Sequence, residues 1–103
     1  MLQGDPEKHI DFLERTRPEK PKPYKVLLEN DPGTNGHLVN DILQDVFRLP
    51  GARAWDVLMS AHRSGVGLVG VYAKEVAETL ASQANGKLTE EGYPGLFSIE
   101  EDE

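Results

Sequence analysis

The chain has 103 residues, a formal net charge of −7 and no cysteine. This length predicts one small domain with a single core, and the absence of cysteine excludes disulfides and thiolate zinc sites. No apolar run approaches the roughly 18 residues of a membrane span, no secretory leader is visible, and the negative charge disfavours nucleic-acid binding. The charge suits a positively charged partner, such as a free α-amino group, a basic peptide or a basic protein surface.

Residues 1–23 form the first segment. They hold four of the seven prolines (Pro6, Pro18, Pro21 and Pro23) and many charged side chains. This composition is typical of a flexible extension. We therefore expect a flexible N-terminal extension over residues 1–23 and a folded domain over residues 24–103. The extension would act either as a solubilising tail or as a segment that reaches a partner.

The first predicted strand lies within Tyr24–Asp31, around the apolar run Val26–Leu28. Prolines precede the run and turn-forming residues follow it, a pattern typical of a buried strand. Asn30 and Asp31 then lie where the strand passes into a helix, and binding groups often occupy such junctions. The alternative is that both residues only shape the turn or cap the next helix.

Two helices are predicted next. The first begins after an N-cap at Thr34 or Asn35, and Pro50-Gly51 ends it. Its apolar residues recur at helical spacing: Leu38, Val39, Ile42, Leu43, Val46 and Phe47. The second begins near Ala52 and is followed by Gly65, which leaves His62 in its last turn. Its predicted core residues are Ala54, Trp55, Val57, Leu58 and Ala61.

The remaining elements are two strands with a helix between them. The strands are predicted at 67–72 and 95–99. The helix begins near Lys74 and either stops at Asn85-Gly86 or, as we favour, continues to Glu91, although a mid-helix glycine costs about 1 kcal/mol. Its predicted apolar stripe is Val76, Ala77, Leu80, Ala81 and Ala84. The element order predicts an α+β two-layer sandwich, with a three-stranded antiparallel sheet packed against three helices.

One group of polar residues could form a site. Asn30, Asp31 and His62 offer an amide oxygen, a carboxylate and one imidazole nitrogen as acceptors, which suits a small donor such as an ammonium group. His62 could equally be an exposed helix-end residue favoured by the helix dipole. An enzyme built on Asp31 and His62 would lack a nucleophile. No two histidines among His9, His37 and His62 have ligand-like spacing, so we expect no catalysis, metal or cofactor.

Three sequence blocks resemble the ClpS family, the adaptors that hand N-degron proteins to a Clp AAA+ unfoldase and the ClpP protease. The blocks are Tyr-Lys-Val-Leu-Leu-Glu-Asn-Asp at 24–31, Ala-His-Arg-Ser-Gly at 61–65 and Glu-Val-Ala-Glu-Thr at 75–79. The similarity runs from about Lys20 to Glu101 without a gap, and it includes Tyr-Pro at 93–94.

The resemblance implies a binding protein that is not an enzyme. Asn30, Asp31 and His62 would grip the α-amino group of a substrate. A pocket would take its first side chain, a large hydrophobic one such as leucine, phenylalanine, tyrosine or tryptophan. The implied pocket residues are Val39, Ile42, Leu58 and Ala61. The implied partners are N-terminal segments of N-degron proteins and the N-domain of a ClpA- or ClpC-type unfoldase, with no nucleic acid or membrane. The implied state is a cytoplasmic monomer.

The chain also departs from the family pattern. Where the family reads Asn-Asp-Asp-Tyr/Asn-Thr-Pro-Met, Pro32 replaces the second acid, Thr34 is kept, and Gly36 replaces a methionine that closes the pocket against β-branched side chains. These changes predict a roomier pocket or one remodelled by the loop. Glu75 matches a residue that docks on the ClpA N-domain, but Leu80 stands where a lysine is expected. The alternative function is a ClpS-fold binding module with altered or relaxed recognition and weak or no delivery.

Overall fold

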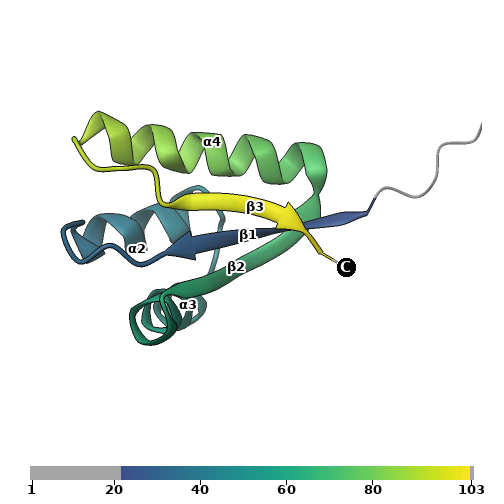
Figure 1. Ribbon diagram of the computed structural model, residues 1–103. Helices are drawn as coiled ribbons and strands as arrows, with labels where there is room; N and C mark the ends of the chain where they lie inside the picture. Colours follow the sequence, from purple (N-terminus) through teal and green to yellow (C-terminus); the bar gives the residue numbers. More distant parts are fainter. Residues whose placement is uncertain (1–21, 103) are drawn as a thin grey trace, which may run out of the picture.

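The structure is a computed structural model that describes residues 22–102. This part of the chain forms three strands and three helices (Figure 1). In order they are β1 (Pro23–Glu29), α2 (Gly36–Asp45), α3 (Gly51–Ser64), β2 (Val66–Ala73), α4 (Lys74–Glu90) and β3 (Phe97–Glu101). The predicted α+β class and element order are confirmed. Because β1 begins at Pro23, this proline belongs to the sheet and not to the segment before it. The prediction of a flexible extension otherwise lies outside the described residues.

β1 is the central strand of an antiparallel sheet in the order β2-β1-β3. Val26 and Leu28 are buried beneath the helices, whereas Leu27 points to the opposite face and is only half-buried. Its partner across the strand pair, Leu68 of β2, is 42% exposed. Side chains alternate between the two faces of a strand, and the helices cover only one face of this sheet. The apolar run of β1 is therefore buried on one side and not throughout.

The helices form the second layer. α3 lies beside β2, α4 lies along β3, and α2 packs against both of these helices (Figure 1). The core that they enclose consists of Val26, Leu28, Val39, Ile42, Leu43, Phe47, Ala54, Val57, Ala61, Val69, Ala77, Ala81, Ala84, Leu88, Leu96 and Phe97. Small alanines on α3 and α4 let the helices approach the sheet closely.

Two predicted core residues are exposed. The side chains of Trp55 and Val76 are 55% and 47% exposed, so their assignment to the core is wrong. Each directly follows or precedes an alanine, Ala54 or Ala77, that is fully buried. Neighbouring helix positions point about 100° apart, and the alanine has taken the inward direction in both cases. The predicted stripe of α4 also missed Leu88, which is fully buried.

A close backbone contact sets the distance between α3 and β2. A Cβ atom on Gly67 would lie 2.5 Å from the carbonyl oxygen of Val57, so no larger residue fits there without moving the helix. The guanidinium of Arg53 also donates to the carbonyl oxygen of Leu68 at 3.0 Å. Gly67 therefore allows α3 to pack directly against the sheet.

Asn85 explains how α4 connects to β3. The helix continues through Asn85 and Gly86 to Glu90, as predicted. The amide nitrogen of Asn85 donates to the carbonyl oxygen of Phe97 at 2.8 Å, and the N–H of Phe97 donates to the Asn85 amide oxygen at 2.9 Å. This paired contact fixes the first residue of β3, which begins two residues later than the predicted strand.

Candidate functional site

The end of β1 is held on both sides by backbone hydrogen bonds. The N–H of Glu29 donates to the carbonyl oxygen of Leu96 at 2.9 Å, and the N–H of Asn30 donates to that of Gly65 at 3.0 Å. Gly65 ends α3 in the left-handed conformation, with φ of 91°, and its own N–H donates to Ala61. Asn30 is thereby fixed beside the last helical turn, which carries His62.

A tight turn leads from the strand to α2. The N–H of Thr34 donates to the carbonyl oxygen of Asp31 at 3.1 Å, and its hydroxyl donates to the Asp31 carboxylate at 2.5 Å. Asn35 then caps α2 by accepting the N–H of His37 at 2.9 Å. Of the two N-cap residues considered from the sequence, Asn35 is therefore the cap, and Thr34 instead fastens Asp31.

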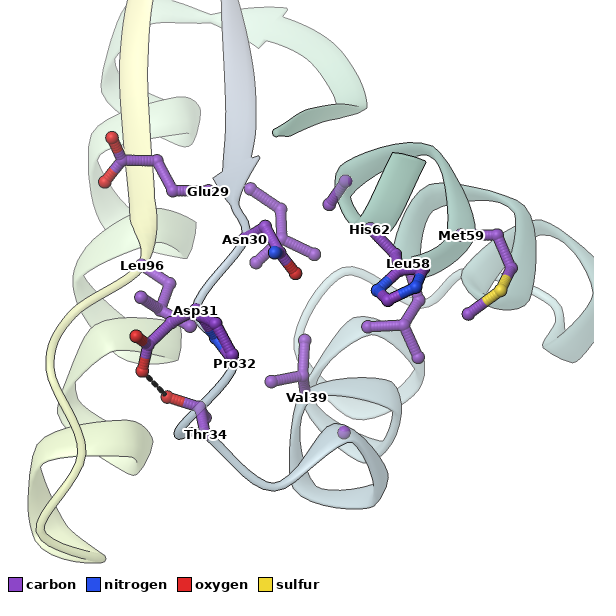
Figure 2. A pocket seen from close by; sticks show the side chains of 13 residues that line it. Glu29, Asn30, Asp31, Pro32, Thr34, Val39, Leu58, Met59, His62 and Leu96 are labelled. Atoms are coloured by element: carbon purple, nitrogen blue, oxygen red, sulfur yellow. Dashed lines mark hydrogen bonds between the residues drawn. The ribbon is translucent and has the colours of Figure 1, made fainter. Parts of the chain in front are cut away.

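A cavity of about 380 Å³, called here the first cavity, opens between this turn and helices α2 and α3 (Figure 2). Its lining residues are Leu28, Glu29, Asn30, Asp31, Pro32, Thr34, Gly36, Val39, Leu58, Met59, Ala61, His62 and Leu96. Most of the surface that it offers a ligand is apolar, while amide, carboxylate and imidazole groups lie on the loop and helix end at its rim.

The predicted pocket residues need one correction. Val39, Leu58 and Ala61 line the first cavity, but Ile42 does not, because it lies one helical turn further along α2 and is buried in the core at 1% exposure. The sequence interpretation also missed Leu28, Met59 and Leu96. Leu28 belongs to the apolar run of β1, and Met59 follows Leu58 on α3, so their positions offered a signal. Leu96 reaches the cavity only through the pairing of β1 with the segment before β3.

The three predicted acceptors do not all converge. In Figure 2 the side chain of Asn30 and the ring of His62 point toward each other across the cavity, and both residues are exposed. The carboxylate of Asp31 points the other way, toward Thr34, with which it is hydrogen-bonded. An ammonium group between Asn30 and His62 would thus meet two acceptors, the Asn30 amide oxygen and a His62 ring nitrogen, and the backbone side of Asp31.

Gly36 leaves the α2 side of the cavity open. A Cβ atom added to this glycine would have no atom within 4 Å. The position where the family pattern has methionine therefore has room for a side chain, and none fills it here.

Tyr72, which does not line the cavity, has a shifted pKa. Burial raises the pKa of the Tyr72 phenol, and the positive charge of Arg53 partly opposes this shift. Within residues 22–102, no group of three or more histidine, aspartate or glutamate side chains could hold a metal ion, and no helix is long and apolar enough to cross a membrane.

The two predicted docking residues lie on α4. Glu75 is exposed in its first turn, while Leu80 is half-buried and packs against the core. The side chain at position 80 therefore lies partly in the core and partly at the surface.

The family model of the ATP-dependent Clp protease adaptor protein ClpS matches residues 19–96. The chain belongs to the ClpS family. ClpS proteins are adaptors of a protease and not the protease itself. Two curated relatives are ClpS 2 of Rhizobium meliloti, 43% identical over 88% of this chain and 90% of that protein, and ClpS 1 of Rhodopseudomonas palustris, 42% identical over 82% of each.

A solved structure also matches this ClpS chain. It is that of Agrobacterium tumefaciens ClpS2 bound to L-phenylalaninamide, with a TM-score of 0.77 and 38% identity. The match covers 81% of this chain and all of the other. The family and fold that the sequence blocks predicted are both confirmed.

Proposed function

We propose that this ClpS family member is an adaptor that binds the free N-terminal residue of a substrate protein and delivers the substrate to a Clp AAA+ unfoldase and its protease. The observation that carries the proposal is the pair Asn30 and His62, which face each other across the rim of an apolar cavity. The relative from Agrobacterium tumefaciens binds L-phenylalaninamide. That ligand combines a free α-amino group with a hydrophobic side chain.

The amine would be held by acceptors at the rim. The amide oxygen of Asn30 and one nitrogen of a neutral His62 ring each accept a hydrogen bond from the ammonium group. Hydrogen bonds that involve a charged group are about twice as strong as neutral ones. Asp31 adds negative charge nearby, although its carboxylate is already bonded to Thr34. Pro32 supplies no side-chain acceptor where the family pattern has a second acid, so binding of the amine depends mainly on Asn30 and His62.

The side chain of the first residue would enter the first cavity. Leu28, Val39, Leu58, Ala61 and Leu96 form its apolar wall. Burial of a whole leucine or phenylalanine side chain contributes about 1.5–3 kcal/mol. We therefore assign large hydrophobic residues, namely leucine, phenylalanine, tyrosine and tryptophan, as the preferred first residues.

The test is fluorescence anisotropy with peptides that differ only in residue one and its N-terminal acetylation. Acetylation removes the ammonium charge and should weaken binding at least tenfold, because it deletes charge-assisted hydrogen bonds of about 1.5–3 kcal/mol each. Asn30→Ala and His62→Ala should each weaken binding of a Phe-started peptide. Arg63→Ala is the matched control, since Arg63 is exposed on the same turn of α3 and does not line the cavity. Unchanged affinity after acetylation would refute the proposal.

Delivery is a separate part of the proposal. Glu75 would dock on the N-domain of a ClpA- or ClpC-type unfoldase, and the adaptor would act as a cytoplasmic monomer. Leu80, Pro32 and Gly36 favour a second candidate, a ClpS-fold binding module with altered or relaxed recognition and weak or no delivery. A pull-down with the unfoldase N-domain, together with degradation of a Leu-started reporter, separates the two candidates.

A further inference from the structure

A second cavity, of about 310 Å³, adjoins the first between α2 and α3. It is lined by Gly36, His37, Asn40, Trp55 and Leu58. Gly36 and Leu58 line both cavities, so the two share a wall. Gly36 has no side chain, and the space that its Cβ would occupy is open, so no side chain at this position separates them.

One face of α3 connects the two cavities. Trp55, Leu58 and His62 follow each other at spacings of three and four residues, which places them on the same side of the helix. His62 lies at the rim of the first cavity, Leu58 in the shared wall and Trp55 in the second cavity. The exposed tryptophan is thus part of the same surface as the predicted amine clamp, about 10 Å further along the helix axis.

Asn40, which lines the second cavity, carries an unpartnered acceptor. The amide oxygen of Asn40 is buried and has no hydrogen-bond partner within the described residues. Buried polar atoms are rarely left in this state, because each costs the free energy of its lost hydration. A turn of the Asn40 amide toward the cavity would expose this oxygen, and an N–H donor from a ligand there would then satisfy it.

The amine clamp would hold one end of a bound peptide, with the amine between Asn30 and His62 and the first side chain beside Leu58. The second cavity adjoins this point on the side of Trp55, and we place the rest of the peptide along α3 in that direction. In an extended peptide the first and third side chains point to the same side, about 6.6 Å apart. The third side chain, and not the second, therefore faces the adjoining cavity.

We propose that the second cavity is a subsite for the third residue of the bound peptide and that arginine fits it best; this inference rests on the proposed function. A guanidinium group is planar, stacks on an aromatic face such as that of Trp55, and carries several N–H donors for the Asn40 oxygen. Lysine carries the same charge but has neither the planar surface nor the fork of donors. The net charge of −7 attracts both residues alike.

The test compares four peptides that share an N-terminal phenylalanine, using the full chain at pH 8. The reference peptide carries alanine at positions two and three. Each of the other three has one replacement: arginine at position three, lysine at position three, or arginine at position two. Arginine at three should tighten binding about fivefold over alanine, while lysine at three and arginine at two should each gain less than twofold. Equal gains for arginine and lysine, or for positions two and three, would overturn the subsite in favour of general charge attraction.

Protein variants locate the effect. Trp55→Ala and Asn40→Leu should each reduce the ratio of affinities between the arginine and alanine peptides from about five to near one. Val76→Ala, a truncation of an exposed apolar residue on α4, should leave the ratio at about five. A ratio that survives both subsite variants overturns the proposal. An acetylated Phe-Ala-Arg peptide distinguishes failure of the proposed function from failure of the subsite. If acetylation does not weaken binding, the proposed function is refuted. If acetylation abolishes binding but the unacetylated peptides show no preference for arginine, only the subsite is refuted.

Discussion

The backbone N–H of Asn30 donates to the carbonyl oxygen of Gly65 at 3.0 Å, and this bond joins the end of the central strand to the end of α3. The Asn30 side chain projects from the strand end of this bond. The His62 side chain projects from the last turn of α3, just before Gly65 at the helix end of the bond. The distance across the rim of the first cavity is therefore set by backbone geometry. Gly65 is important because it turns the chain with a φ of 91°, which other residues adopt only with strain.

Replacing this glycine should affect both stability and binding. Gly65→Ala places a Cβ in open space but in a left-handed conformation, which costs about 1–2 kcal/mol. For a domain of this size the Tm should fall by about 4–8 °C per kcal/mol. If the turn relaxes to relieve the strain, Asn30 and His62 separate, and the affinity for a Phe-started peptide should fall several-fold beyond any effect of stability.

Gly92→Ala is the matched control for this prediction. Gly92 also has a positive φ, of 86°, with open space at its Cβ, but it follows α4 and does not line either cavity. The two variants should lose similar stability, and only Gly65→Ala should lose affinity. Equal affinity in both would show that the bond between Asn30 and Gly65 does not control the site.

Filling the open position at Gly36 should narrow specificity. Gly36→Met adds a side chain at the boundary between the two cavities without a clash at its Cβ. We expect it to weaken binding of Ile- and Val-started peptides about tenfold relative to a Phe-started one, within the 1–3 kcal/mol range of pocket discrimination. Gly36→Ala separates the effect of the side chain from that of the backbone. If the unaltered protein already excludes isoleucine and valine, the idea of a permissive pocket is wrong.

Asn85 should be a strong determinant of stability. Its amide makes two hydrogen bonds, at 2.8 and 2.9 Å, to the backbone of Phe97. Asn85→Ala removes both and leaves a part-buried N–H and carbonyl group unpaired, so urea denaturation should show a loss of about 2–3 kcal/mol. Gln83→Ala, on the exposed side of the same helix, should change stability by less than about 0.5 kcal/mol. A similar change in both variants would contradict the role assigned to Asn85.

The order and type of the elements could be predicted from the sequence because they depend on local patterns. The run Val26–Leu28, the glycine after α3 and the helical spacing of apolar residues each act within a few positions. Side-chain exposure was harder to predict. Trp55 is next to a buried alanine and turns toward the second cavity, a choice that depends on how α3 meets the sheet at Gly67.

The candidate site could likewise be predicted only in part from the sequence. Asn30 and His62 could be selected from the sequence because each ends a predicted element. That the Asp31 carboxylate would be occupied by Thr34 depends on the exact turn that Pro32 and Gly33 form. The contribution of Leu96 depends on a backbone bond to Glu29, 67 positions earlier in the chain (96 minus 29). Contacts of this kind have no local signature, so the structure was needed to find them.

Position 80 offers a test of delivery. Leu80 is half-buried on α4, five residues after the exposed Glu75. In Leu80→Lys the aliphatic part of the lysine can keep much of the packing while its ammonium group reaches solvent. We expect tighter binding to a ClpA-type N-domain in a titration, little change in peptide affinity, and a stability loss of about 1 kcal/mol at most. Glu75→Ala should weaken the same docking interaction. If the unaltered protein docks as tightly as Leu80→Lys, and Glu75→Ala has no effect, α4 is not the surface that meets the unfoldase.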